Sequence, residues 1–228
     1  MSVRPPKKAG PRSLRARAKE IGRRLADRYP AHCALTHGSP YELLVATVLS
    51  AQCTDARVNQ VTPALFQRYP FSEALARADP AELEELIRPT GFFRSKARNL
   101  IGLAMALEDR FGGEVPTALD DLVTLPGVGR KTGNVVRSVA FGLPGLPVDT
   151  HVGRLSRRLG LSVSEDPVQV ESDLMALLPP QDWGDLSLRL ILHGRAVCVA
   201  RRPRCGDCLL IDLCPSRLMS PPSPSGSS

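Results

Sequence analysis

The sequence lacks the features that would place a protein in a membrane or on an export route. No apolar run in its 228 residues reaches the roughly 18 positions that a membrane span needs. The N-terminal stretch has no apolar segment of the kind found in secretory signals. Strand-like alternation of apolar and polar residues is hard to find, and no internal repeat is visible. We therefore expect a cytoplasmic, mainly helical protein that does not act on a membrane.

Acidic residues are scarce near the N-terminus, where the first 24 residues contain nine Lys or Arg and one Glu. Such a start can be an organellar transit peptide, but a basic tail is the preferred interpretation. The whole chain has a formal net charge of +7. Clustered positive charge is typical of a surface that follows a polyanionic backbone. Two further clusters are Arg154, Arg157 and Arg158, and Arg195, Arg201, Arg202 and Arg204.

Helix signals follow one another along the chain. Residues 13–29 place apolar side chains on one helical stripe, and "SPYELLVATVLSAQ" and "DPAELEELI" each begin with a capping residue, a proline and a glutamate. The segment "LPGLP" separates the middle helices from the part that carries most cysteines, and the N-terminal helix could pack with either side. The Pro- and Ser-rich end has little to bury, so we expect it to be disordered. Further helices are predicted over residues 95–111, 130–141, 149–159, 167–178 and 182–197.

The stretch "LPGVGRKTGNVV", residues 125–136, predicts a helix-hairpin-helix element. Glycines permit a tight backbone path, so that N–H groups of the hairpin and of the next helix point at one spot. Unpaired donors and the helix dipole favour a phosphate there. A plain tight turn between two core helices is the alternative. Phosphate contacts position DNA without reading its bases, and the residues expected to make them are Gly127, Val128, Gly129 and Arg130.

Lys131 and Asp149 each lie at the predicted start of a helix, on either side of "LPGLP". Taken alone, Lys131 would be a phosphate contact and Asp149 a helix N-cap. Together they could form a reactive pair. A lysine amine attacks only when it is neutral, which a positive helix end and partial burial favour. The amine could displace a base from the anomeric carbon of a sugar and leave a Schiff base, while the carboxylate stabilises positive charge on the sugar.

Four of the six cysteines are crowded into the pattern C-x6-C-x2-C-x5-C, as Cys198, Cys205, Cys208 and Cys214. Disulfides are disfavoured in a chain without an export signal. Zinc sites usually consist of two close pairs with a longer spacer, whereas only one pair is close here. The spacing therefore favours a 4Fe–4S cluster over a structural zinc ion. Such a cluster would hold a basic loop, including Arg201, toward phosphates, and nothing indicates redox turnover.

The motifs "LPGVGRKT", "VDTH" and "ILHGR", followed by the cysteine pattern, resemble the endonuclease III family in this order. "LLVATVLSAQCTD" and "GFFRSKARNLI" extend the resemblance upstream, so that it runs from about Leu14 to Cys214. It implies an all-α, bilobal helix-hairpin-helix DNA glycosylase fold. A six-helix barrel lobe would come from residues 33–143, and an iron–sulfur cluster lobe from 13–32 with 144–214. A disordered basic tail, 1–12, and a second disordered tail, 215–228, would flank them.

The resemblance also implies an activity. The chain would be a bifunctional DNA glycosylase/AP lyase of base excision repair, with Lys131 as the Schiff-base lysine, Asp149 as the essential aspartate and the four cysteines as cluster ligands. It would excise oxidised pyrimidines from duplex DNA and cleave 3′ to the abasic site by β-elimination. The expected partner is double-stranded DNA with damaged or abasic sites, bound by a monomer at the bacterial nucleoid.

Three further residues gain roles only through the resemblance. Gln52 matches a glutamine that fills the space vacated by a flipped base. Phe92 lies where family members often carry leucine as a wedge, and Phe93 is the competing candidate. His151, after "VDT", would lie near the catalytic acid, either as a structural hydrogen-bonding group or as a substrate contact.

Three other interpretations compete with this one. Adenine-mismatch glycosylases share the fold and the cysteine pattern, but they carry serine at the position of Lys131 and extend into a further domain, which disfavours a monofunctional adenine- or uracil/thymine-mismatch enzyme. A non-catalytic helix-hairpin-helix scaffold would not need both Lys131 and Asp149. An iron–sulfur electron carrier would not need the basic hairpin.

Overall fold

The computed structural model describes residues 11–217, with side chains from residue 14 onward. Throughout this range the regular secondary structure is helical, without a strand. The chain divides into two compact units, one formed by residues 32–147 and the other by the described residues on either side of them. None of the helices in these residues is long and apolar enough to cross a membrane. The two expected tails lie outside the described residues, except for 11–12 and 215–217. Residues 11–12 begin helix α1, so the expected disorder is wrong for them.

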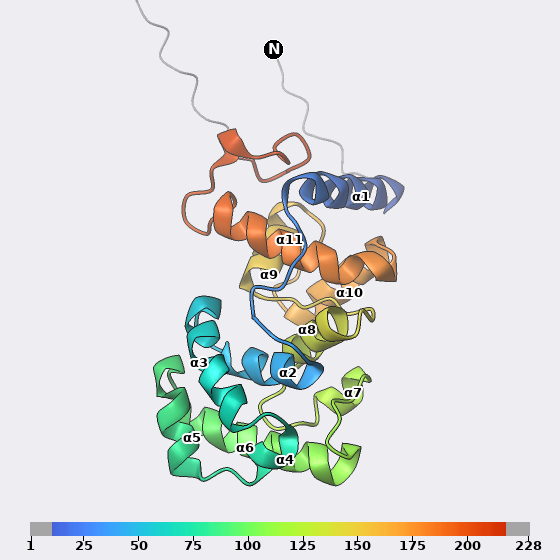
Figure 1. Cartoon of the computed structure of the whole chain (residues 1–228). Helices are drawn as coiled ribbons and strands as arrows, with labels where there is room; N and C mark the ends of the chain where they lie inside the picture. The colour runs from blue at the N-terminus through green and yellow to red at the C-terminus, as the bar shows by residue number, and fades with distance from the viewer. Residues whose placement is uncertain (1–10, 218–228) are drawn as a thin grey trace, which may run out of the picture. The chain divides into compact units, whose positions relative to one another are not determined.

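The unit formed by residues 32–147 is built around two central helices. Helix α2 is buried over eight of its ten residues, and it contacts α3, α6 and α8. Helix α6 packs on α4 and α5, and it begins at Phe93, two residues earlier than predicted. Figure 1 shows the helices of this unit: α2 Pro40–Leu49, α3 Asp55–Arg68, α4 Ser72–Ala76, α5 Pro80–Ile87, a 3-10 turn Arg88–Thr90, α6 Phe93–Phe111, α7 Leu119–Leu122 and α8 Arg130–Ala140.

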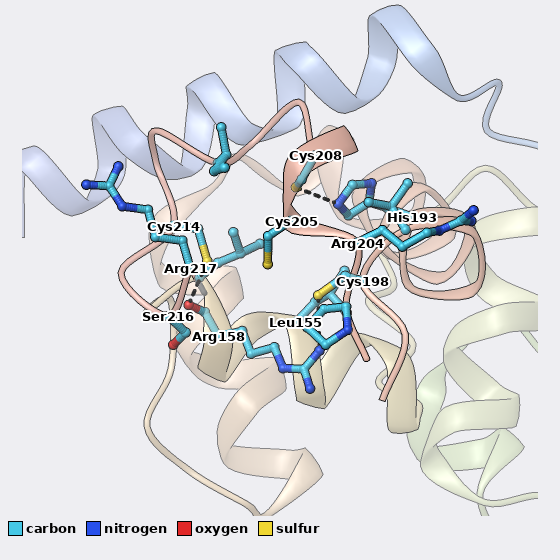
Figure 2. A pocket seen from close by; sticks show the side chains of 14 residues that line it. Leu155, Arg158, His193, Cys198, Arg204, Cys205, Cys208, Cys214, Ser216 and Arg217 are labelled. Atoms are coloured by element: carbon cyan, nitrogen blue, oxygen red, sulfur yellow. Dashed lines mark hydrogen bonds between the residues drawn. The ribbon is translucent and has the colours of Figure 1, made fainter. Parts of the chain in front are cut away.

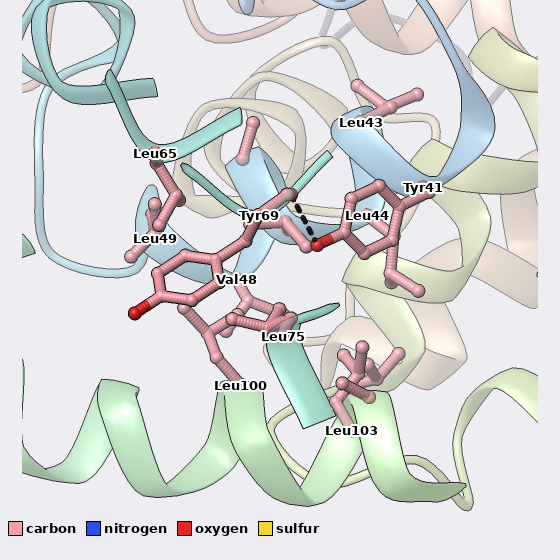
Figure 3. Packing of buried hydrophobic residues seen from close by; sticks show 14 of the residues in the cluster. Tyr41, Leu43, Leu44, Val48, Leu49, Leu65, Tyr69, Leu75, Leu100 and Leu103 are labelled. Carbon is pink, nitrogen blue, oxygen red and sulfur yellow. Dashed lines mark hydrogen bonds between the residues drawn. The ribbon is translucent and has the colours of Figure 1, made fainter. Parts of the chain in front are cut away.

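The core of this unit is a cluster of buried leucines and valines that closes around Tyr69 (Figure 3). Tyr41 enters the same cluster and donates its hydroxyl to the main-chain carbonyl of Tyr69 at 3.1 Å. This bond satisfies the buried polar end of Tyr41, which would otherwise oppose its burial. The core thus fixes α2 against the C-terminal end of α3.

The predicted capping sites begin helices as expected, but their glutamates act differently from a capping box. The Ser39 hydroxyl accepts the Glu42 N–H at 3.2 Å, and the Asp79 carboxylate accepts the Glu82 N–H at 2.9 Å. The Glu42 carboxylate accepts the N–H of Gly38, one residue before the cap, at 2.6 Å. Glu82 instead pairs with Arg68 of α3 at 2.6 Å. Both helices are therefore capped, and the second glutamate fixes α5 to α3.

The other unit joins the N-terminal helix to the last three helices. Helix α1, Pro11–Arg28, contacts α10 and α11, and α9 contacts the same two helices (Figure 1). The predicted stripe of α1 is buried at Ala18, Ile21 and Leu25. The remaining elements of this unit are α9 Thr150–Arg158, α10 Pro167–Leu177, a 3-10 turn Pro180–Asp182, α11 Trp183–Ala196 and a 3-10 turn Cys205–Asp207.

Candidate functional site

The predicted hairpin lies between α7 and α8 and packs on α6. Gly127 has φ +77°, and a Cβ atom there would lie 3.0 Å from the Cβ atom of Asn99 in α6. Glycine is therefore required at this position by both backbone and space. Gly129 differs, because its φ is −92° and a Cβ atom would enter open space. It is the N-cap of α8, and no side chain of the described residues caps that helix. A glycine at this position brings no side chain to the N–H groups at the start of α8.

Val128 is placed differently from its neighbours. Its side chain is buried in the core, and its N–H donates to the carbonyl of Leu125 at 3.1 Å. Arg130 and Lys131 begin α8 and are both exposed. The positively charged side chains therefore extend from the hairpin, while Val128 anchors it.

The two hairpin glycines allow a matched comparison. Gly127→Ala is expected to lower the free energy of unfolding by about 1–2 kcal/mol, because a residue with a Cβ atom adopts the left-handed conformation at that cost. Gly129→Ser is expected to leave stability unchanged or raise it, since serine is a favoured N-cap. The same serine would occupy N–H groups at the start of α8 and weaken binding to duplex DNA. Denaturant unfolding and DNA affinity at one fixed salt concentration measure both effects. Equal stability losses in the two variants would contradict this interpretation.

Lys131 occupies the first turn of α8 and is exposed to solvent. Partial burial, which was expected from the sequence to favour its neutral form, is not present around Lys131. The positive end of α8 is present beside it.

Asp149 is the N-cap of α9 and is half-buried. Its Oδ1 atom accepts the N–H of Val152 at 2.8 Å. The cap interpretation from the sequence is thus correct as far as one carboxylate oxygen is concerned. A cap hydrogen bond to one oxygen fixes the orientation of the carboxylate, and a side chain held in this way can also have a second role.

Gln52 and Phe92 share an uncommon backbone conformation. They are the two non-glycine residues between 11 and 217 with a positive φ, +53° and +49° respectively. The left-handed region costs a residue with a side chain about 1–2 kcal/mol, and such strain tends to be kept at functional positions. Both residues are exposed, and 66% of the surface of Phe92 is accessible to solvent.

Phe93 is held more firmly than Phe92. Its ring packs partly buried against the core, and the guanidinium group of Arg88 lies 5.3 Å from the ring centroid, with that of Arg94 at 5.6 Å. Removing Phe93 from this position would break apolar and cation–π contacts. Phe92 is the more exposed of the two aromatic residues.

His151 is packed inside its own unit. Its Nδ1 atom lies 3.2 Å from a guanidinium nitrogen of Arg154. A Cβ atom at Gly194 would approach Nδ1 to 2.9 Å, which explains the glycine of "ILHGR". Burial lowers the pKa of His151, opposed by Asp149 nearby. These contacts favour the structural alternative for His151 over the substrate contact.

The four clustered cysteines border one cavity, as Figure 2 shows. No three Cys, His, Asp or Glu side chains within residues 11–217 are close enough together to hold a single metal ion. Four thiols around a shared space fit a polynuclear cluster, which takes one thiolate per iron, better than they fit one zinc ion. Burial raises the pKa of the Cys208 and Cys214 thiols, and bound iron would favour their thiolate forms.

His193 borders the same cavity. Its role there was not predicted from the sequence. Its Nε2 atom lies 3.4 Å from the Cys208 sulfur, and its Nδ1 atom lies 3.1 Å from the Tyr29 hydroxyl. Burial lowers the pKa of His193 to about 4. The neutral ring thus connects Tyr29, the residue that follows α1, to the cysteine loop. The histidine of "ILHGR" was the available signal, but its partner Tyr29 is 164 positions away in the sequence.

Two arginines of the basic cluster on α9 are half-buried and bind the main chain of the cysteine loop. Arg154 donates to the Cys198 carbonyl at 3.0 Å, and Arg158 donates to the Val199 carbonyl at 2.9 Å and the Ala200 carbonyl at 2.6 Å. Their guanidinium groups satisfy the main chain of the loop between the first two cysteines. Arg201 of that loop is exposed. These hydrogen bonds give Arg154 and Arg158 a structural role in the cysteine loop, and phosphate binding by the cluster on α9 stays a prediction.

Comparisons with known proteins agree with this arrangement. Residues 45–180 match the family model described as HhH-GPD superfamily base excision DNA repair protein. Residues 198–214 match the iron–sulfur binding domain of endonuclease III. These two matches cover the hairpin with Lys131 and the cysteine loop. They place the chain in the class of base excision repair glycosylases.

Relatives identify the branch of that superfamily. Endonuclease III of Synechocystis is 57% identical over 90% of this chain and 94% of its own length. Endonuclease III of Bacillus subtilis is 49% identical over 84% and 88%. A trapped covalent intermediate of endonuclease III with DNA has a TM-score of 0.83 and 45% identity, covering 92% of this chain and 97% of that one. The chain belongs to the endonuclease III family.

Several predictions from the sequence are confirmed by these matches. The all-α helix-hairpin-helix glycosylase fold is correct, as is the activity class, a bifunctional DNA glycosylase/AP lyase of base excision repair. The 4Fe–4S cluster is the cofactor of the cysteine loop. A thermostable thymine-DNA glycosylase also has this fold, with a TM-score of 0.79 at 23% identity.

Proposed function

We propose that Lys131 is the nucleophile, and that the enzyme removes oxidised pyrimidines from duplex DNA. The observation that carries this proposal is the position of Lys131, exposed on the first turn of α8 directly behind the uncovered hairpin. A phosphate held at the hairpin would bring a sugar of the same strand to the lysine. Positioning of this kind converts a bimolecular attack into an intramolecular one.

The reaction follows from the residues in hand. The neutral Nζ atom of Lys131 attacks C1′, the glycosidic bond breaks, and the base leaves with its electron pair and acquires a proton. The Asp149 carboxylate stabilises the positive charge that develops on the sugar. Opening of the sugar ring gives a Schiff base between Lys131 and C1′. Loss of a C2′ proton then expels the 3′ phosphate by β-elimination, and water releases Lys131 from the product.

Gln52 and Phe92 have a separate role in this proposal. A base must leave the stack before its glycosidic bond is reached, and the space that it vacates must be filled. Both residues are exposed and held in the left-handed conformation. We assign Phe92 as the wedge, since the ring of Phe93 packs on the core. Gln52 would fill the space beside the unpaired partner base.

The cysteine loop has a structural role. The four cysteines would each supply one thiolate to the cluster, which would close the loop from Cys198 to Cys214. Arg158 and Arg154 then hold the main chain that carries Arg201. Arg201 is exposed and is proposed to contact a phosphate. Residues 33–143 would form the barrel domain, and 13–32 with 144–214 the cluster domain, close to the boundaries of the two compact units.

One chain would suffice for this chemistry, because it supplies both Lys131 and Asp149. We therefore propose a monomer that acts on DNA with damaged or abasic sites at the bacterial nucleoid. Light scattering of the enzyme bound to a duplex with one lesion tests the stoichiometry.

A panel of duplexes tests the activity. The panel contains an oxidised pyrimidine, a uracil mismatch, an adenine mismatch and an abasic site, each read by base release and by borohydride trapping. We expect release and trapping with the oxidised pyrimidine and trapping with the abasic duplex. Release from a mismatch without trapping would instead identify a monofunctional enzyme. Binding without release or trapping would identify a scaffold.

A further inference from the structure

Lys96 is a buried lysine that the mechanism above does not use. It lies in the first turn of α6, and only 5% of the residue is exposed. Lysine is almost never fully buried unless its charge has partners. A buried ammonium group therefore indicates that the surrounding structure depends on its hydrogen bonds.

The partners of Lys96 are main-chain carbonyls from two separate turns. Its Nζ atom donates to the Leu49 carbonyl at 2.8 Å and to the Thr90 carbonyl at 2.9 Å. Leu49 is the last residue of α2, where a cation is favoured by the helix dipole. Burial lowers the pKa of Lys96. The side chain thus joins the end of α2 to the turn that precedes α6.

The two turns are those that carry the strained residues. Gln52 follows Leu49 by three positions, and Phe92 follows Thr90 by two. The main-chain N–H of Lys96 also donates to the Phe92 carbonyl at 3.0 Å. A left-handed residue persists only where its surroundings determine it. Lys96 is one residue whose hydrogen bonds reach both the turn before Gln52 and the turn that contains Phe92.

We infer that Lys96 is a positioning residue that holds the Gln52 turn and the Phe92 turn as one unit, so that both side chains enter the DNA in register. The inference rests on the proposed roles of Gln52 and Phe92. Lys96 itself touches neither DNA nor the reacting atoms. A purely structural lysine would stabilise the fold without this link between the two turns.

The test uses two DNA substrates and the full-length enzyme. A duplex with a tetrahydrofuran abasic analogue and 2-aminopurine in the opposite strand reports entry of Gln52 and Phe92 through unstacking fluorescence. Trapping on a single-stranded abasic oligonucleotide needs Lys131 but no wedge, so it reports the active fraction. Lys96→Met removes the ammonium group and keeps the length of the side chain. Arg110→Met, which removes one positive charge at an exposed position near the other end of α6, is the control.

We expect Lys96→Met to slow base excision from duplex DNA by about 10- to 100-fold, as small misplacements near a reaction do. The fluorescence rise should fall with it, while trapping on single-stranded DNA, corrected for folded protein, stays unchanged. Arg110→Met should behave as wild type. Adding Lys96→Met to a variant with Gln52→Ala and Phe92→Ala should have no further effect, because the residues act as one unit.

Gly91→Ala supplies an independent test that leaves Lys96 intact. Gly91 has φ +70° and ψ 160° and open space around it, so alanine strains only the Phe92 turn. If the turns are coupled, the part of the fluorescence that depends on Gln52 falls as well. Loss of the Phe92-dependent part alone would overturn the inference. If Lys96→Met does not fold, Gly91→Ala still tests whether the two turns are coupled.

Two other results would count against the inference. Wild-type fluorescence and excision in Lys96→Met would show that the lysine positions nothing. Equal losses on duplex and single-stranded DNA would show a general structural role. Failure of the proposed function is distinct from both, because wild-type enzyme itself would then fail to trap abasic DNA or to respond to Gln52→Ala and Phe92→Ala.

Discussion

Lys131→Ala is expected to abolish covalent trapping and to slow base release by at least about 10³-fold, as loss of a nucleophile does in other enzymes. Alanine removes the amine that would form the Schiff base and leaves the helix start intact, since Lys131 is exposed and contributes little to packing. DNA binding should persist, because the hairpin and the uncovered end of α8 remain. Single-turnover excision and borohydride trapping measure the chemical step, and affinity for a tetrahydrofuran duplex measures binding.

Arg130→Ala is the neighbouring control. Arg130 is also exposed at the start of α8, so its loss removes one positive charge at nearly the same place. It should weaken DNA binding and reduce the salt dependence of affinity by about one phosphate contact. At saturating enzyme, its trapping yield should match wild type. If Lys131→Ala traps as well as Arg130→Ala does, another amine forms the adduct and the assignment of Lys131 is wrong.

The parts of the site that could be predicted from the sequence are those that depend on residues close together in the chain. The hairpin of Gly127, the caps Ser39 and Asp79, and the cysteine spacing each depend on residues within a few positions of one another. Local hydrogen bonds and ligand spacing determine such elements directly. The caps therefore begin helices in the structure where the sequence placed them.

The parts that could not be predicted depend on long-range partners. Arg154 and Arg158 have the same composition signal as surface arginines, yet their acceptors are carbonyls more than 40 positions away. Lys96 gives no signal at all, because it sits in a helix with ordinary polarity and its two carbonyl partners become neighbours only in the fold. A charged residue in the sequence carries no mark of its burial.

Unusual backbone conformation is a second feature that could not be predicted from the sequence. Gln52 and Phe92 gained their expected roles through a family resemblance, and nothing in the sequence indicated a positive φ at either residue. Glycine is the residue that predicts such a conformation, and Gly91 beside Phe92 has it. The strain at Gln52 and Phe92 therefore adds independent support to the resemblance, since it falls on the two residues that would enter DNA.

Asp149→Asn is expected to slow base excision by about 10²- to 10⁴-fold, within the range for loss of an acid–base group, while leaving the fold nearly intact. Oδ1 of Asp149 accepts the Val152 N–H, and an asparagine oxygen can do the same. Asparagine caps a helix about as well as aspartate. The substitution thus removes the charge and retains the cap. Single-turnover excision and denaturant unfolding measure the two consequences separately.

Asp166 provides the matched control in the same unit. It caps α10 through the Val168 N–H at 3.2 Å, so Asp166→Asn should resemble Asp149→Asn in stability and leave excision unchanged. Asp149→Ala and Asp166→Ala should each lose about 1 kcal/mol of unfolding free energy through loss of a cap. If Asp149→Asn retains full excision while Asp149→Ala loses it, Asp149 acts only by capping α9. If Asp149→Asn keeps the cap and loses excision, the negative charge itself takes part in the reaction. Stability, the start of α9 and the size of the side chain are all unchanged in that variant.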